Sequence, residues 1–141
     1  MVSKISIIIP TLNAASSIGD LIARLLEQTI HPEEIVIIDS SSTDNTVSIA
    51  ASFPHVSTII IPQEEFNHGK TRHKALMATK GEFVCFLTQD AMPIDNEYLQ
   101  NLLAPFACPK VALCTGKQEP KEDAFKYVQL VQSFNYPDKS N

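Results

Sequence analysis

Apolar and polar positions along the chain follow two alternating periods, which predicts strands separated by helices. Residues 5–9 form a β-branched run that Pro10 closes, because proline cannot donate to a strand ladder. Residues 35–38 are apolar without alternation, as expected for a parallel strand buried on both faces. Between these runs, apolar positions recur at helical spacing over residues 17–28. The first forty residues therefore predict a strand, a helix and a second strand.

The same alternation continues toward residue 115. Further strands are predicted over residues 56–61, 82–87 and 110–115. Helical apolar faces precede or separate them at residues 47–53, 75–78 and 98–106. Strands that alternate with helices form right-handed crossovers, so helices cover both faces of the sheet. The predicted fold class is α/β, a three-layer α/β/α arrangement with a mainly parallel, Rossmann-like sheet.

Composition narrows the class of protein further. The chain has 141 residues, of which 44% are hydrophobic and 19% charged, as in an ordinary globular domain. A formal charge of −5 disfavours broad contact with nucleic acid, which needs a cationic face. No apolar run approaches the roughly 20 residues that span a bilayer, and the N-terminus lacks a secretory signal pattern. We therefore predict a cytoplasmic protein with no transmembrane segment, while peripheral association with a membrane stays open.

Candidate chemistry lies where the predicted strands end. Ligands of open α/β sheets bind outside the carboxyl ends of the strands, and four polar loops meet that description. These loops span residues 10–13, 39–44, 66–72 and 88–90. They offer carboxylates, amides, hydroxyls and cations, but no dinucleotide or phosphate-loop glycine pattern. The three cysteines lack the close pairing of a metal or redox site, which predicts buried free thiols.

Four segments in this order carry a family resemblance: Ile-Ile-Ile-Pro-Thr-Leu-Asn at 7–13, Ile-Ile-Asp-Ser-Ser-Ser-Thr-Asp-Asn-Thr at 37–46, Asn-His-Gly-Lys-Thr-Arg at 67–72 and Phe-Leu-Thr-Gln-Asp-Ala at 86–91. Together they resemble the nucleotide-sugar half of a family 2 glycosyltransferase with the GT-A fold. The loop at 40–44, the segment at 66–69, the end at 88–91 and a later Phe-Asn-Tyr-Pro at 134–137 resemble rhamnosyltransferases. The likeness covers residues 5–137.

The resemblance implies a set of residues that bind a nucleotide sugar. They are Pro10, Thr11, Asn13, Asp39, Ser41, His68, Arg72, Gln89 and Asp90. Asp39 would accept the N3–H of uracil or thymine, and a turn-capping role is its alternative. Thr11 and Asn13 would border the base and ribose, although an Asx turn explains Asn13 almost as well.

Asp90 stands where the family has the last carboxylate of its Asp-x-Asp metal motif, and Thr88 replaces the first. The resemblance thus implies Mg²⁺ or Mn²⁺ held by Asp90, phosphate oxygens and water. Arg72 is the predicted diphosphate partner, since a guanidinium fork and a helix N-terminus both favour an anion. Lys70 either assists or is a solvated cation. His68 either touches the donor or orders its loop.

These roles imply a glycosyltransferase that passes a sugar from a dTDP- or UDP-linked donor, dTDP-rhamnose first, to a cell-surface glycan with inversion. No carboxylate matches the family's general base, so the catalytic residue is unassigned. We place residues 1–116 in the nucleotide-sugar-binding domain and residues 117–141 in an extension toward the acceptor side, and we expect a truncated chain. The alternative is a donor-binding module or fragment without turnover.

Overall fold

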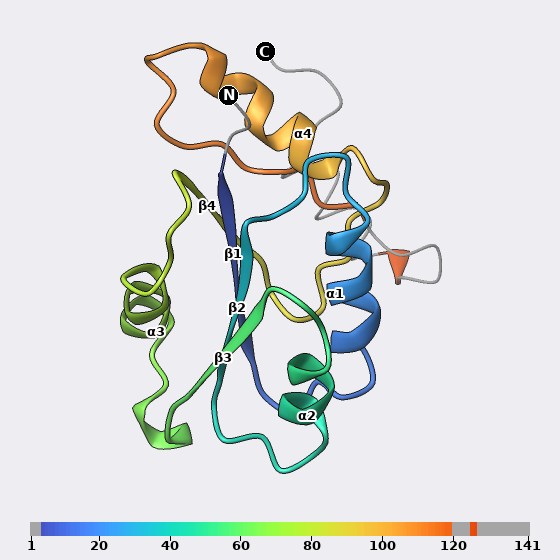
Figure 1. The fold of residues 1–141 in the computed structure, drawn as a ribbon, viewed down its shortest axis with the longest axis vertical. Helices are drawn as coiled ribbons and strands as arrows, with labels where there is room; N and C mark the ends of the chain where they lie inside the picture. Colours follow the sequence, from blue (N-terminus) through green and yellow to red (C-terminus); the bar gives the residue numbers. More distant parts are fainter. Residues whose placement is uncertain (1–3, 120–124, 127–141) are drawn as a thin grey trace. The chain divides into compact units, whose positions relative to one another are not determined.

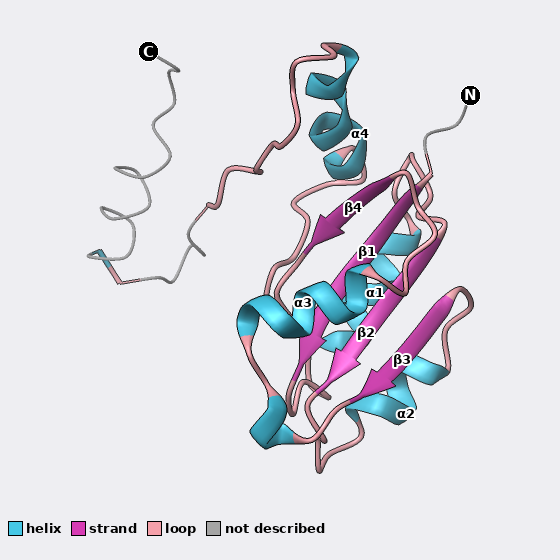
Figure 2. Ribbon diagram, turned by 90° about the vertical axis from the view of Figure 1, so that its left-hand side faces the viewer, coloured by secondary structure: helices cyan, strands magenta, loops and turns pink. Residues whose placement is uncertain are grey.

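The computed structural model describes residues 4–119 and 125–126, and a parallel sheet lies at its centre. In chain order the elements are β1 (Ile5–Thr11), α1 (Ile18–Leu26), β2 (Glu34–Asp39), α2 (Thr46–Ala51), β3 (Val56–Ile60), a 3-10 turn η1 (Gln63–Glu65), α3 (His68–Leu76), β4 (Phe83–Phe86), α4 (Tyr98–Leu103) and a second 3-10 turn η2 (Ala104–Ala107). Within the described residues the strand order is β3-β2-β1-β4, and every pairing is parallel (Figure 2).

Helices cover both faces of this sheet. α3 lies on one face, while α1 and α2 lie together on the other (Figure 1). The buried cluster on the α3 side joins strand residues Ile8, Val36 and Ile38 to Ala75 of the helix. The predicted α/β fold with three layers and a mainly parallel sheet is confirmed.

The central strands are buried because each carries apolar side chains toward both layers. In β1, Ile8 points to the α3 face, so its neighbours Ile7 and Ile9 point to the opposite face. All three are fully buried. On α1, the buried side chains are those at helical spacing, namely Ile18, Leu21, Ile22 and Leu25. This packing fixes the strands, and thereby the loops at their carboxyl ends.

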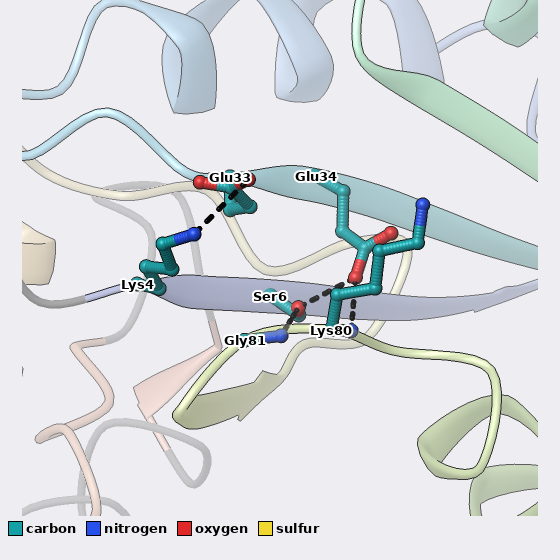
Figure 3. A network of polar contacts seen from close by, with 6 residues as sticks. All are labelled: Lys4, Ser6, Glu33, Glu34, Lys80 and Gly81. Carbon is teal, nitrogen blue, oxygen red and sulfur yellow. Dashed lines mark hydrogen bonds and ion pairs between the residues drawn. The ribbon is translucent and has the colours of Figure 1, made fainter.

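A polar network fastens the amino ends of β1, β2 and β4 (Figure 3). The buried Ser6 hydroxyl donates to Glu34 Oε1 at 2.8 Å and accepts the Gly81 N–H at 2.8 Å. The Lys80 N–H donates to the same glutamate oxygen at 2.6 Å. The nearby Lys4–Glu33 ion pair is 4.0 Å long and exposed, so it adds little. Ser6 thus connects β1 to β2 and to the turn that follows α3.

The prediction of a fifth strand over residues 110–115 is wrong. In the structure these residues form a turn and an irregular segment, and the Cys114 thiol donates to the Leu102 carbonyl. Strand propensity is expressed only where a neighbouring strand completes the ladder, and none of the described strands pairs with this segment. The predicted tail helix and the Phe-Asn-Tyr-Pro segment at 134–137 lie outside the described residues.

The chain divides into two compact units, Met1–Gln100 and Asn101–Asn141, with the boundary inside α4. The predicted boundary after residue 116 stays a prediction. The expectation of three buried thiols is confirmed for Cys85 alone: Cys114 is half-buried, and Cys108 is exposed. Its sequence neighbours are apolar, yet the 3-10 turn η2 ends there and turns the thiol outward.

We expect Gly81→Ala to destabilise the fold by about 1–3 kcal/mol, the usual cost of overpacking. A Cβ at this position would lie 2.6 Å from both the backbone N and the Oγ of Ser6. Gly69→Ala is the matched control, because its Cβ would meet nothing closer than Asn67 Oδ1 at 3.6 Å. Urea denaturation of both variants measures the difference. Equal stability of the two would contradict the close packing at Gly81.

Candidate functional site

The site is built around the last paired residues of β1 and β2, Thr11 and Asp39. Both are buried, and the Thr11 hydroxyl donates to Asp39 Oδ1 at 2.8 Å. Ser42 adds two more bonds to the carboxylate, one from its hydroxyl at 2.6 Å and one from its backbone N–H at 2.7 Å. A buried carboxylate needs such donors, because leaving it unpaired is costly. Asp39 therefore fixes the start of the loop after β2.

The loops after β1 and β2 are joined by a second set of bonds. The Asn13 N–H donates to the Ser42 hydroxyl at 2.8 Å, and Asn13 Oδ1 accepts the Thr43 N–H at 2.9 Å. Asn13 and Ser41 have φ values of 50° and 56°, in the left-handed region that non-glycine residues seldom adopt. The Ser41 hydroxyl donates to the Ile61 carbonyl at 2.8 Å. These bonds hold both loops in one arrangement.

Thr46 and Asp44 extend the junction to the first residues of the two helices. The buried Thr46 hydroxyl accepts the Ala14 N–H at 2.8 Å and donates to Asp44 Oδ1. Asp44 also accepts the N–H groups of Ala15 and Thr46, each at 3.0 Å. The Thr46 hydroxyl, first among these donors, lowers the pKa of the exposed Asp44 carboxyl below its ordinary 3.8. Side chains at the end of the loop after β2 thus accept backbone N–H groups of the loop after β1.

The turn after β4 carries the predicted metal-binding residue. The Ala91 N–H donates to the Thr88 carbonyl at 3.1 Å, which closes a four-residue turn with Gln89 and Asp90 at its middle. Asp90 is exposed, whereas Gln89 is half-buried and bonds to the backbone of Leu12. The loops after β1, β2 and β4 are therefore linked through hydrogen bonds.

α3 begins at the same end of the sheet with a well-formed cap. Asn67 Oδ1 accepts the N–H groups of Gly69 and Lys70, both at 3.1 Å, and the Asn67 N–H donates to the Thr71 hydroxyl. His68 is exposed, and its ring meets Phe66 edge-on with centroids 5.0 Å apart. The cap explains why the helix begins before residue 70, earlier than its apolar residues alone indicate.

Arg72 lies on a different flank of α3 from Lys70 and Lys74. A cavity of about 510 Å³ borders the flank that carries Asn67, Lys70 and Lys74, together with Ile61 after β3. At helical spacing, the Arg72 side chain points away from that flank. The Arg72 Nε is buried and has no hydrogen-bond partner among the described residues. A buried donor of this kind is seldom left unpaired, so this guanidinium is poised for an acceptor.

The structure brings several predicted site residues together and keeps others apart. Pro10 and Thr11 end β1, Asp39 ends β2, Asn13 and Ser41 lie in the joined loops that follow, and Gln89 links the turn of Asp90 to them. His68 and Arg72 belong to α3, outside that network. Sequence reasoning missed the linking roles of Ser42 and Thr46, since a serine or threonine after a strand resembles any helix cap.

The described residues contain no preformed metal cage. Within residues 4–119 and 125–126, no three His, Cys, Asp or Glu side chains gather as a metal-binding group. The turn after β4 offers one exposed carboxylate, that of Asp90. In the same part of the chain, no helix has the length and apolarity needed to cross a bilayer.

Comparison with known proteins gives a family match over nearly the whole chain. The family model described as Glycosyl transferase family 2 matches residues 6–140. The chain is 38% identical over 138 residues to the O-antigen chain rhamnosyltransferase RfbN of Salmonella typhimurium, covering 97% of this chain and 44% of that protein. It is 40% identical over 133 residues to WbaN of Salmonella anatum, an enzyme of the same description, covering 93% and 42%. The chain thus spans less than half the length of these relatives.

Solved structures agree on the fold. A mannosyltransferase from Pyrobaculum calidifontis, in complex with GDP-Man and Mn²⁺, superposes with a TM-score of 0.67 and 28% identity, over 79% of this chain and 34% of that one. TarS from Staphylococcus aureus gives a TM-score of 0.65 and 27% identity, over 84% and 38%. These likenesses place the sheet and its helices among GT-A folds, as predicted from the sequence.

Thr46→Val should raise the pKa of Asp44 toward its ordinary value and cost about 1–3 kcal/mol, because the Ala14 N–H loses its acceptor. Because the pKa of Asp44 is lower in the folded state, its hydrogen bonds stabilise the fold fully at pH values above the ordinary pKa of 3.8. This stabilisation is lost as the pH falls through the folded-state pKa. Carboxyl NMR titration and urea denaturation measure the two effects. Thr46→Ser keeps the hydroxyl and should match the wild type; a loss equal to that of valine would exclude the hydroxyl as the cause.

Proposed function

The chain belongs to glycosyltransferase family 2, and on this premise we propose that it binds a nucleoside-diphosphate sugar at the carboxyl ends of β1, β2 and β4. The donor is dTDP-rhamnose or a UDP-linked sugar, and the acceptor is a glycan of a cell-surface polysaccharide. Transfer proceeds by direct displacement with inversion. The observation that carries the proposal is the match to two Salmonella rhamnosyltransferases over more than nine-tenths of the chain.

The geometry supports a nucleotide that lies across the strand ends. Asp39 ends β2, Thr11 ends β1, and Asp90 follows β4, in the order of those strands in the sheet. Arg72 carries a buried Nε that has no hydrogen-bond partner among the described residues. The base therefore belongs near Asp39, and the diphosphate belongs between Arg72 and Asp90. Ligands of open α/β sheets generally bind in the crevice outside the carboxyl ends of the strands.

Asp90 holds Mg²⁺ or Mn²⁺ in this proposal, together with phosphate oxygens and water. Its carboxylate is exposed, and a hard cation of this kind commonly takes one or two protein carboxylates. When bound, the cation offsets the charge of the departing diphosphate. Mn²⁺ accompanies GDP-Man in the Pyrobaculum mannosyltransferase, which supports the same use here.

Asp39 accepts the N3–H of a pyrimidine in this proposal. Three donors already occupy its carboxylate, which offers about four lone-pair positions. Asp39 is fully buried, so the base reaches it only when the Ser42 hydroxyl turns aside. Replacing Asp39 would also leave the donors of Thr11 and Ser42 unpaired. Its role is therefore tested with ligands that lack the N3–H rather than by substitution alone.

Thermal unfolding with dTDP, UDP, GDP and N3-methylated thymidine diphosphate, each with and without Mn²⁺, tests the proposal directly. We expect dTDP and UDP to stabilise the chain by about 2.7 kcal/mol at a hundredfold excess over Kd. GDP and the methylated nucleotide should do less. Asp90→Asn should remove the Mn²⁺-dependent part, while Glu33→Gln, an equal charge change at the opposite end of the sheet, should not. No shift with any nucleotide would overturn the donor site.

Turnover separates an enzyme from a donor-binding module. The assay combines the chain with dTDP-rhamnose, Mn²⁺ and a rhamnose-accepting glycan, and it measures released dTDP. Acceptor-dependent release establishes transfer by this chain. Nucleotide binding without release identifies the module, the second candidate.

We expect Arg72→Ala to weaken dTDP binding about tenfold or more while thymidine binding changes little, because a charge-assisted bond to the diphosphate is lost. Arg72→Lys should recover only part of it, since lysine lacks the guanidinium fork. Lys74→Ala, a cation on the opposite flank of α3, is the control. Isothermal titration supplies the affinities. Equal losses for dTDP and thymidine would assign Arg72 to the fold instead.

A further inference from the structure

The pairing of β1 with β4 ends earlier than that of β1 with β2. Along β1, even-numbered residues bond toward β4: the Phe83 N–H donates to the Lys4 carbonyl and the Leu87 N–H to the Ile8 carbonyl, each at 3.0 Å. Odd-numbered residues bond toward β2, as when the Ser40 N–H donates to the Thr11 carbonyl at 2.9 Å. The next rung toward β4 falls on residue 10. Because Pro10 has no N–H, it cannot donate a bond toward β4 in that rung.

Gln89 supplies the following rung with its side chain. Leu12 directly follows β1 and lies two positions beyond Pro10, so it continues the series of residues whose backbone faces β4. Its N–H donates to Gln89 Oε1 at 2.8 Å, and its carbonyl accepts a bond from Gln89 Nε2 at 3.3 Å. A carboxamide has one acceptor and donors in one plane, so it pairs with a peptide group as a neighbouring strand would.

This contact joins the two halves of the site. On one side, Gln89 lies beside Asp90 in the turn that the Thr88 carbonyl and Ala91 N–H close. On the other side, Leu12 precedes Asn13, whose N–H donates to the Ser42 hydroxyl beneath Asp39. Gln89 thus connects the turn of Asp90, through Leu12 and Asn13, to the Ser42 hydroxyl that donates to Asp39.

We propose that Gln89 is a positioning residue: its carboxamide replaces the strand pairing that Pro10 interrupts and thereby fixes Asp90 relative to the loop after β1. The part of this inference that concerns a metal-bound diphosphate rests on the proposed function. The part that concerns the backbone of Leu12 does not. Gln89 touches neither phosphate nor metal in this scheme and acts through the placement of Asp90.

The test compares Gln89→Ala with Gln63→Ala, an exposed glutamine in η1 on the β3 side of the sheet. Amide exchange measured by NMR should show the Leu12 N–H exchanging about tenfold faster in Gln89→Ala, with the central amides of β1 unchanged. Dye-free calorimetric titration with dTDP then gives the affinity with and without Mn²⁺. We expect metal-free affinity within about twofold of wild type and an Mn²⁺-dependent gain reduced about tenfold.

Each outcome decides a different statement. An unchanged exchange rate of the Leu12 N–H in Gln89→Ala overturns the inference that the Gln89 carboxamide holds the Leu12 backbone. Faster exchange with an unchanged Mn²⁺-dependent gain overturns the positioning of Asp90. Equal losses of metal-free and metal-dependent affinity assign Gln89 a purely structural role and likewise overturn it. If the wild type shows no Mn²⁺-dependent gain, the proposed function fails, and Leu12 exchange still decides whether Gln89 replaces the missing rung.

Discussion

The site depends on one buried contact, the bond between the Thr11 hydroxyl and the Asp39 carboxylate at the end of the β1–β2 pairing. Both groups are removed from water, so each needs a partner within the protein. Ser42 completes the set by donating twice to the same carboxylate. The bonds that reach Asn13 and Thr43 start from this point. Without it, a buried hydroxyl and a buried carboxylate oxygen would each lose a partner at the point where both loops begin.

A parallel sheet explains why these contacts accumulate at one edge. The described strands all point the same way, so their carboxyl ends lie there, together with the loops that lead into α1, α2 and α3. The opposite edge has its own fastening through Ser6, Glu34 and the turn at Gly81. The two ends of the sheet differ. The amino end is tightly packed around Gly81, whereas the carboxyl end exposes polar groups such as Asp90. The proposed donor site and the close packing at Gly81 therefore lie at opposite ends of the same strands.

Glutamine and proline together give the site an adaptation that a regular sheet would not need. Pro10 ends the ladder toward β4, which lets the chain after β4 leave the sheet and form the turn at Asp90. The bond pair from Gln89 to Leu12 returns that turn to β1. Because this link is made by the Gln89 side chain, a substitution of Gln89 can change the position of Asp90 while the backbone pairing of the sheet stays intact.

The order of strands and helices follows from the sequence alone. The continuous apolar run at 35–38 reflects a strand buried on both faces, and the helical spacing at 17–28 reflects a helix buried on one face. The polar loops at the strand ends were predictable for the same reason. The sequence also suggested a strand at 110–115, where local propensity had no partner strand to act on. Only the tertiary structure decided which polar groups bond: Asp39 to Ser42, Thr46 to Ala14, and Gln89 to Leu12. Those pairs are 3 to 77 residues apart, and loop geometry rather than periodicity brings them within reach.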